Sequence, residues 1–271
     1  MSYADKVFKG MCRDILDNGV STEGEKVRPV WEDTNESAYT IKKFGVVNRY
    51  DLRKEFPALT LRRTALKSAF DELLWIWQKK SNNVHDLNSH IWDAWADEDG
   101  SIGKAYGYQL GVKHQYKEGE MDQVDRVIYD LKNNPYSRRI MTNIYVHQDL
   151  HEMNLYPCAY SMTFNVTQKK GEDKLTLNAI LNQRSNDVLT ANNWNVAQYA
   201  LLVHMLAQIK PHLNNNRILK ESEVMEILGV SKKTMQNYRN EGLKAFQPTG
   251  SQYYYFMSDL EAFVRRNGRA L

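Results

Sequence analysis

The sequence predicts an α/β (α+β) protein. A mainly antiparallel or mixed sheet with helices packed on one side is expected over residues 1–210, and a small separate module over residues 217–271. Residues 161–168 alternate between apolar and polar side chains, the period of a strand with one buried face. Residues 64–80 instead space their apolar side chains as the buried face of a helix does. Charge sets the small module apart, because its nine lysines and arginines against six acidic residues account for the whole net charge of +3.

The composition is that of a packed globular protein, with 42% hydrophobic and 11% aromatic residues in a chain of 271. The two cysteines, Cys12 and Cys158, do not make a disulfide framework and fit a reducing compartment. No apolar run approaches the roughly 20 residues that span a bilayer, and the first fourteen residues are too charged for a signal peptide. We therefore expect a cytoplasmic protein that does not enter a membrane.

Four helices and two strands are predicted in the first part of the chain. The helices span residues 3–19, 64–80, 122–135 and 195–209. Gly19 closes the first helix, an Asn-Asn-Pro turn stops the third, and the fourth is apolar on most sides, which suits the centre of the fold. Residues 25–51 are expected to form a loop with short strands. The two longer strands, residues 161–168 and 174–185, flank the turn sequence KKGED.

The pattern changes after the linker sequence KPHLNNN. Residues 221–243 are predicted to form two short helices joined by a Gly-Val-Ser turn, with Ser231 as the N-cap of the second. Residues 247–256 are predicted to form a β-ribbon that turns at Thr249–Gly250, and residues 258–266 a closing helix. Such a module in the basic part of the chain indicates a polyanion as its partner.

One cysteine has an unusual setting, because Cys158 directly follows a proline in NLYPCAYSM. A free cysteine is usually a small buried hydrophobe, and the alternative is a nucleophile. Arg184 follows a predicted strand, and an arginine near a cysteine raises the thiolate fraction. Asn195 offers the amide donor and acceptor that reading a nucleobase edge requires. Taken singly, Arg184, Asp187 and Asn195 also fit turn and capping positions.

Together these residues belong to a set of motifs that resembles thymidylate synthases along most of residues 1–208. The matching stretches, in the family's order and spacing, are VRPVW, DELLWIWQ, HIWDAWADEDGSIGKAYGYQL, DQVDRVIYDLKNNPYSRRI, LYPCAY, and QRSNDV followed by WNVAQYALLVHMLAQ. The resemblance is strongest to the versions from Gram-positive bacteria and their phages. It implies a homodimer formed through the sheet face that the helices leave open.

The resemblance implies a catalytic role for five residues: Cys158, Arg184, Glu72, Tyr106 and Asn195. Cys158 matches the nucleophile that adds to C6 of dUMP, and Arg184 the arginine that contacts both this thiol and the nucleotide phosphate. Glu72 matches the glutamate that organises water and proton transfers, and burial in an apolar helix is expected to raise its pKa. Tyr106 matches a tyrosine of the proton-transfer network.

Further residues match substrate and folate contacts. The phosphate contacts fall on Arg28 in a mobile loop, on Arg138 and Arg139 reaching across the homodimer, and on Arg184 and Ser185, and guanidinium groups suit a dianion. The folate contacts fall on two residues: Trp92 by stacking and Asp187 by a hydrogen bond to the pterin. Trp95 is expected in the core beside Trp92.

The residue at Asn195 bears on the choice of base. The related deoxycytidylate hydroxymethylases carry an aspartate at the matching position. An amide accepts from N3–H and donates to O4 of uracil, whereas a carboxylate lacks the second bond. The asparagine therefore favours uracil over cytosine.

The sequence departs from the family pattern after residue 208. The family's Gly-Asp-x-His-x-Tyr motif and C-terminal lid are not found in it, and His212 has no tyrosine two residues on. Residues 217–271 instead resemble helix-turn-helix modules of the excisionase and MerR-like kind. The residues that the second helix would present to a DNA groove are Lys232, Lys233, Gln236, Asn237 and Arg239.

The leading expectation is reductive methylation of dUMP to dTMP, with methylenetetrahydrofolate as carbon donor and hydride source and no metal. One alternative is a catalytically impaired synthase-like body fused to a module that binds duplex DNA, acting as a regulator or nucleotide sensor. The other is a deoxyuridylate hydroxymethylase, in which water replaces hydride at the same intermediate.

Overall fold

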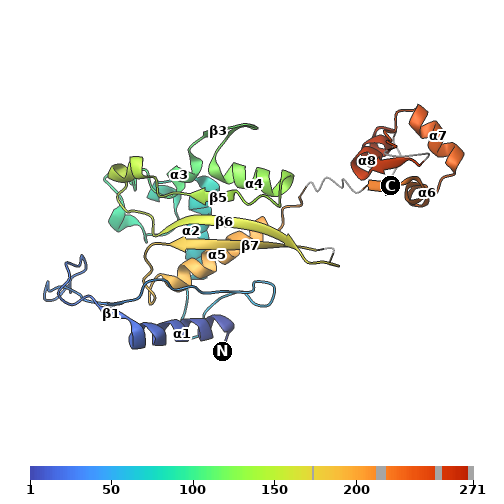
Figure 1. Ribbon diagram of the computed structural model, residues 1–271. Coiled ribbons are helices and arrows are strands. Elements are labelled where there is room, and N and C mark those ends of the chain that lie inside the picture. The colour runs from blue at the N-terminus through green and yellow to red at the C-terminus, as the bar shows by residue number, and fades with distance from the viewer. Residues whose placement is uncertain (173, 212–217, 248–251, 268–271) are drawn as a thin grey trace. The chain divides into compact units, whose positions relative to one another are not determined.

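The computed structural model describes residues 1–172, 174–211, 218–247 and 252–267. The chain divides into two units, Met1–Pro211 and His212–Leu271 (Figure 1). Each unit has a hydrophobic core of its own. No helix among the described residues is long and apolar enough to cross a membrane.

The sheet of the first unit has three antiparallel strands in the order β5 (Ile140–Asn143), β6 (Ala159–Gln168) and β7 (Leu175–Gln183). The two predicted strands are confirmed as β6 and β7, which pair with each other along most of their length. Strand β5 is not predicted from the sequence, because four residues are too few for alternation to stand out. Its inner residues are nevertheless among the best-buried of the unit, with Ile140 fully buried.

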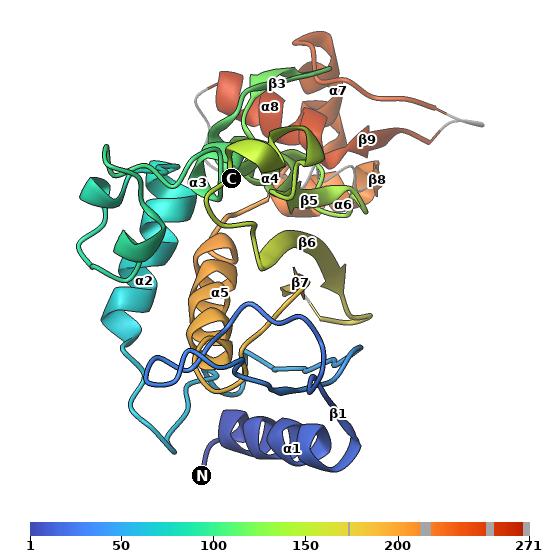
Figure 2. The ribbon, with the colours of Figure 1, turned by 90° about the vertical axis from the view of Figure 1, so that its left-hand side faces the viewer.

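Two helices lie in successive layers on one face of this sheet, and the other face is open (Figures 1 and 2). They are α5 (Asn192–Leu206) and α2 (Leu66–Leu74), which pack on each other. Because α5 lies between the sheet and α2, it is apolar on most sides, as its sequence predicts. The helix predicted over residues 64–80 is shorter than expected and continues as a π-helical turn, Trp75–Lys79. Trp75, Ile76 and Trp77 are all buried there, and the wider turn directs three consecutive large side chains inward.

The first segment of the chain matches its prediction at both ends. Helix α1 (Tyr3–Asn18) begins at a capping box formed by Ser2 and Asp5 and ends at Gly19. The short strands expected in residues 25–51 reduce to one: β2 (Ile41–Lys42) pairs with β1 (Val20–Ser21).

The remaining elements of the first unit are short. They are the 3₁₀ turns Val84–Asp86, Asp93–Trp95 and His147–Glu152, the helices α3 (Gly107–Gly111) and α4 (Gln123–Asn133), and the hairpin of β3 (His114–Tyr116) and β4 (Gly119–Met121). Helix α4 ends just before Pro135, as predicted from the Asn-Asn-Pro turn.

The second unit contains the predicted pair of short helices. Its elements are β8 (Ile218–Lys220), α6 (Glu221–Leu228), α7 (Lys232–Asn240), β9 (Tyr254–Phe256) and α8 (Met257–Arg266), with β8 and β9 paired antiparallel. Gly229 takes the left-handed conformation that ends α6, and Ser231 caps α7 by accepting a hydrogen bond from the Thr234 N–H. The expected turn at Thr249–Gly250 lies outside the described residues, as does His212.

Candidate functional site

Cys158 occupies the residue directly before β6, at the start of the sheet's central strand. Its carbonyl oxygen accepts from the Arg184 N–H at 3.0 Å, and its own N–H donates to the Tyr106 hydroxyl oxygen at 3.2 Å. The β6–β7 register shifts between Ala159 and Ser161, one residue further on. A bulge at a strand end changes the direction of nearby side chains. Cys158, next to this bulge, is half-buried, and hydrogen bonds with Arg184 and Tyr106 hold its backbone.

The Arg184 guanidinium is fixed beside the thiol. Its Nε donates to the Pro157 carbonyl at 2.9 Å and its Nη2 to the Tyr156 carbonyl at 2.7 Å. The same Nη2 lies 3.9 Å from the Cys158 Sγ. The guanidinium is therefore within reach of the thiolate, the form in which a cysteine attacks an electrophilic carbon.

Tyr106 contacts Cys158 from a strained backbone position. Its φ of 45° is unusual for a residue with a side chain, and the cost is offset by the contacts around it. A Cβ on the next residue, Gly107, would come within 2.1 Å of the Ser81 carbonyl oxygen, so only glycine allows this close approach. Burial, together with the nearby Cys158, raises the pKa of the Tyr106 hydroxyl, which therefore stays protonated.

Glu72 is a buried carboxyl with two donors from α5. Its side chain is 7% exposed, the Gln198 amide donates to Oε1 at 3.1 Å, and the Trp194 indole donates to Oε2 at 3.2 Å. Burial raises the pKa of Glu72, and hydrogen bonds from Gln198, Trp92 and Trp194 work in the opposite direction. A carboxyl in this environment can exchange a proton closer to neutral pH than an exposed one.

Trp92 links Glu72 to Tyr106. Its ring lies 4.9 Å from the Tyr106 ring, edge to face, and 5.7 Å from the Trp75 ring. Trp92 is 7% exposed, whereas Trp95 is 37% exposed. The expectation that Trp95 belongs to the core is therefore wrong. The 3₁₀ turn Asp93–Trp95 begins directly after Trp92 and places the centres of the two tryptophan rings 5.7 Å apart, with Trp95 itself partly exposed.

Asp187 and Asn195 lie in the segment that leads into α5. The Asp187 carboxylate accepts from the N–H groups of Leu189 and Thr190 at 2.9 Å, so it stabilises the turn. Burial alone would raise its pKa, but the hydrogen bonds from Thr190 and Leu189 outweigh this and lower it. Asn195 is half-buried in the first turn of α5, and its amide has no hydrogen-bond partner among the described residues.

The structure thus brings five of the expected residues into one connected cluster. They are Cys158, Arg184, Tyr106, Trp92 and Glu72. Arg28, Arg138, Arg139 and Ser185 are exposed, and within the described part of one chain their side chains do not bond to this cluster.

Sequence reasoning missed Trp194 and Gln198, the two residues that hold Glu72. They are four residues apart and so share one face of α5. A signal was present, since Gln198 is an amide inside an otherwise apolar helix, and a buried amide requires a partner.

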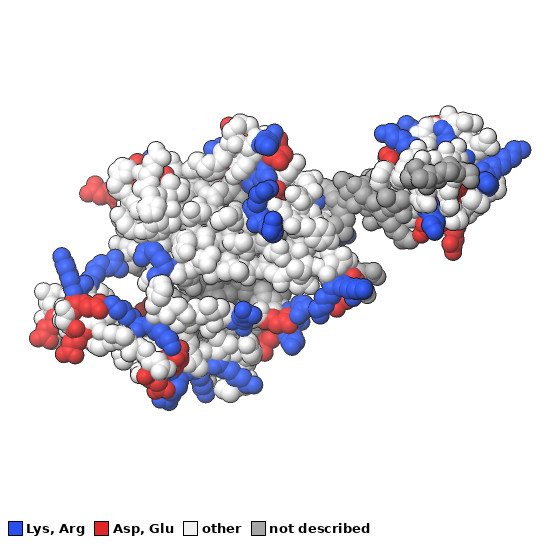
Figure 3. Space-filling view, viewed as in Figure 1, with Lys and Arg blue, Asp and Glu red and all other residues white. Residues whose placement is uncertain are grey.

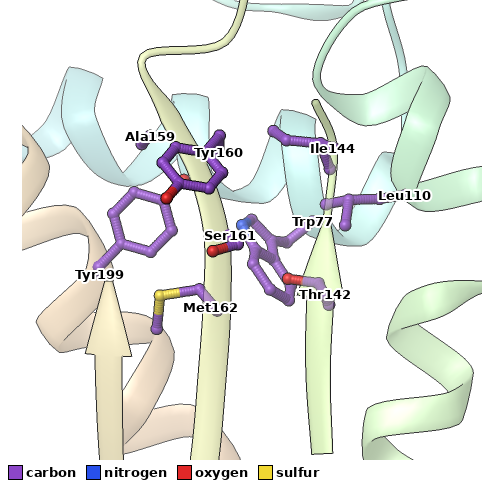
Figure 4. Close-up of a pocket in the computed structure, with 9 residues that line it drawn as sticks. All are labelled: Trp77, Leu110, Thr142, Ile144, Ala159, Tyr160, Ser161, Met162 and Tyr199. Atoms are coloured by element: carbon purple, nitrogen blue, oxygen red, sulfur yellow. The ribbon is translucent and has the colours of Figure 1, made fainter. Parts of the chain in front are cut away.

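A small cavity of about 10 Å³ lies against β6 just beyond Cys158 (Figure 4). It is lined by Trp77, Leu110, Thr142, Ile144, Ala159, Tyr160, Ser161, Met162 and Tyr199. Such a volume suits about one water molecule, so a nucleotide must approach Cys158 from the solvent.

A larger hollow of about 600 Å³ runs along residues 84–100, but Asp93, Asp97 and Glu98 in its lining disfavour an anionic ligand.

The second unit places four of its five expected DNA contacts on the surface. Lys232, Lys233, Gln236 and Asn237 are exposed on α7. Arg239 differs from the prediction. Its Nη1 pairs with the Glu221 Oε2 at 2.7 Å and bonds the Tyr255 hydroxyl, and its guanidinium lies 3.9 Å from the centre of the Tyr253 ring. Glu221 and Tyr255 are buried, and a buried carboxylate needs a cationic partner.

Residues 6–220 match the family model for thymidylate synthase. The chain belongs to the thymidylate synthase family. A second family model, for a helix-turn-helix domain, matches residues 218–268. Both resemblances expected from the sequence are therefore confirmed.

Two relatives of this thymidylate synthase family member come from the expected group of organisms. It is 44% identical over 213 residues to the thymidylate synthase of Bacillus subtilis subsp. natto, and 43% identical to that of Bacillus phage phi3T. Each alignment covers 77% of this chain and 74% of the relative. Among solved structures, the thermostable thymidylate synthase A from Bacillus subtilis superposes with a TM-score of 0.70 at 42% identity, over 77% of this chain and 73% of that one.

Proposed function

We propose that the first unit catalyses the reductive methylation of dUMP to dTMP. The observation that carries the proposal is the Arg184 guanidinium, which is held by two carbonyl oxygens at 3.9 Å from the Cys158 sulfur. A fixed cation beside a half-buried thiol is the arrangement of an activated nucleophile. Methylenetetrahydrofolate supplies the one-carbon unit and the hydride.

The cluster around Cys158 divides the chemistry among its members. The Cys158 thiolate adds to C6 of the pyrimidine, which makes C5 a carbon nucleophile. C5 then bonds to the one-carbon unit of methylenetetrahydrofolate, and the C5 proton leaves toward the network of Tyr106 and Glu72. The folate departs from the carbon as tetrahydrofolate, its hydride reduces the resulting methylene group, and the thiolate leaves C6, which gives dTMP and dihydrofolate. Glu72 suits the proton transfers because burial raises its pKa.

The binding roles are those of the matching residues in the family. Arg28, Arg184 and Ser185 contact the phosphate of dUMP, and Arg138 and Arg139 reach it from the second subunit of a homodimer. Asn195 reads uracil, because its side-chain amide has no partner in the described part of the chain and is available to the base. Trp92 and Asp187 bind the folate.

The open face of the sheet supports the homodimer. Met141, Thr163 and Ile180 lie side by side across β5, β6 and β7, and Met141 and Ile180 are 51% and 61% exposed. In Figure 3 the middle of this face carries few charged side chains, while lysines, arginines and acids lie toward its margins. A weakly charged patch with exposed apolar side chains is typical of an interface.

We place the protein in the cytoplasm, since the nucleophile has to remain a reduced thiol and both cysteines are free in the structure.

A covalent trap tests the nucleophile, and turnover tests the reaction. Fluoro-dUMP with methylenetetrahydrofolate should add their combined mass to the chain, and Cys158→Ser should abolish the adduct while Cys12→Ser keeps it. Dihydrofolate absorbance should rise with dUMP, and the product should be dTMP. An adduct that persists in Cys158→Ser removes this residue from the mechanism. Hydroxymethyl-dUMP as product would assign the hydroxymethylase reaction instead.

A second candidate function is duplex DNA binding by the helix-turn-helix unit. The exposed lysines and amides of α7 and the family match over residues 218–268 support it. Binding should weaken steeply with salt, because each phosphate contact releases counterions. Deleting residues 217–271 should abolish duplex binding and leave dUMP affinity unchanged. Salt-dependent binding without turnover would favour a regulator or nucleotide sensor, and turnover without duplex binding would favour the enzyme alone.

A further inference from the structure

Helix α7 carries a row of polar side chains with helical spacing. The exposed positions are Lys232, Lys233, Gln236, Asn237 and Asn240. Spacings of one, four, five and eight residues place them on one face. No hydrogen bond or ion pair engages their side chains within the described residues, and Lys232–Asn240 contains no acidic residue. The face therefore offers donors and positive charge to an external, anionic ligand.

The arginine of this helix is withheld from that face. Arg239 is 16% exposed in its side chain, and its guanidinium is engaged by Glu221, Tyr255 and the Tyr253 ring. Releasing it would leave the Glu221 carboxylate buried without its cation, which is strongly unfavourable. What remains exposed in the middle of α7 is a pair of neighbouring amides, Gln236 and Asn237.

The chemistry of amides in a groove points to one base. Asparagine and glutamine bond adenine through N6 and N7 together, whereas the commonest guanine contact uses a bidentate arginine. Lysine offers a single ammonium, which suits a phosphate as a point charge. We propose that α7 reads adenine in the major groove of duplex DNA through Gln236 and Asn237, while Lys232 and Lys233 bind phosphates. This inference rests on the DNA-binding function proposed above.

Selection from random duplexes with the full chain tests the base preference. The recovered sites should share adenine at one or two fixed positions, read from the strand that faces α7. Replacing that adenine should weaken binding roughly 5- to 150-fold, as expected for one bidentate pair. Asn237→Ala or Gln236→Ala should remove the preference at one position and leave the others intact.

Two sets of variants separate base reading from charge. Lys232→Ala and Lys233→Ala should weaken all duplexes alike and lower the slope of log affinity against log salt by about 1 each. Gln208→Ala, which changes an exposed amide of the first unit, should alter neither affinity nor preference. Thermal unfolding of each variant verifies that the second unit remains folded.

Failure of the DNA-binding function and failure of the adenine preference give different results. If the full chain binds no duplex even at low salt, the DNA-binding function falls, and this inference with it. If it binds but selects guanine, or selects adenine equally well in Gln236→Ala and Asn237→Ala, the DNA-binding function stands and the adenine-reading role of α7 is overturned.

Discussion

Glu72 is a buried carboxyl that is held by side chains from a second helix. The motif DELLW identifies Glu72 itself, and the apolar helix predicts its burial, which the structure confirms. The donors that hold it come from α5, more than a hundred residues later in the chain. Contacts at such separation depend on how two helices dock, and no local pattern encodes that. Arg239 is a second example, because its partner Glu221 is brought close by the fold and cannot be identified from the local sequence.

Trp194 offers a direct test of this environment. Trp194→Phe removes the donor to Oε2 and keeps the ring, so the carboxylate loses a hydrogen bond that stabilises its charged form. The pKa of Glu72 should rise further, and the acidic limb of kcat/KM against pH should move to higher pH. Trp31→Phe, at an exposed tryptophan, is the matched control.

A readout that does not need turnover makes the test independent. In protein labelled with ¹⁵N-tryptophan, the Trp194 indole signal should titrate with Glu72, and Glu72→Gln should abolish that titration. An indole signal insensitive to Glu72→Gln would mean that the two side chains are not bonded in solution.

Base choice should respond to Asn195. In Asn195→Asp the uracil O4 loses its donor, and an unpaired buried polar group costs roughly 1–3 kcal/mol. Nucleotide affinity should therefore shift from dUMP toward dCMP, as measured by calorimetry. An unchanged preference would show that Asn195 does not face the base.

At the scale of elements, prediction succeeded where a period repeats several times. β6, β7, α1, α4 and α5 follow from alternation, helical spacing and end signals. The four-residue β5 and the π-helical turn Trp75–Lys79 were not predicted. The strand is too short for an alternating pattern to be recognised, and the π-helical turn depends on which side chains it contacts in the core.

The end of that π-helical turn is tied to α4 by a charged cluster that can be tested. Lys80 and Lys113 donate to the buried Asp122 carboxylate at 2.6 and 2.9 Å, and the Asp125 N–H donates at 2.9 Å. Burial would raise the pKa of Asp122, but these three donors outweigh it and lower the pKa to about 2. Asp122→Asn should lower the free energy of unfolding by roughly 1–3 kcal/mol at neutral pH, as measured by denaturant titration.

The pH dependence of this effect has a definite sign. The folded-state pKa lies below the ordinary value of 3.8, so Asp122 contributes stability above about pH 4 and loses that contribution as the pH falls toward 2. The difference between wild type and Asp122→Asn should therefore shrink over this interval. Asp99→Asn, at an exposed aspartate, should show neither the loss nor the pH dependence.

For the whole molecule, the sequence predicted two parts from the location of the excess charge, and two family models match the two parts. The resemblance implies a dimer through the sheet face that the helices leave open, but residue patterns alone do not show which side chains lie on that face, since this depends on how the helices pack. In the structure the open face is that of β5, β6 and β7.

Ile180 on the open face of the sheet allows the dimer to be tested. Ile180 lies in the middle of β7 with 61% of its surface exposed, in register with Thr163 of β6. If two copies meet there about a two-fold axis, Ile180→Lys buries a charge in each copy, and the dimer should dissociate. Sedimentation equilibrium measures this. Ile227→Lys, at an exposed isoleucine of the second unit, makes the same chemical change away from the sheet and should leave the dimer intact.

Dissociation of the dimer should also affect nucleotide binding. Cys158, Arg184, Tyr106 and Glu72 are held within one chain, so the variant should keep its nucleophile in place. It should nevertheless bind dUMP more weakly and form the fluoro-dUMP adduct more slowly, because Arg138 and Arg139 no longer reach the phosphate from the second subunit. Arg138→Ala combined with Ile180→Lys should then weaken binding no more than Ile180→Lys alone. A monomeric variant with unchanged dUMP affinity would show that each chain binds its nucleotide without help from a second one.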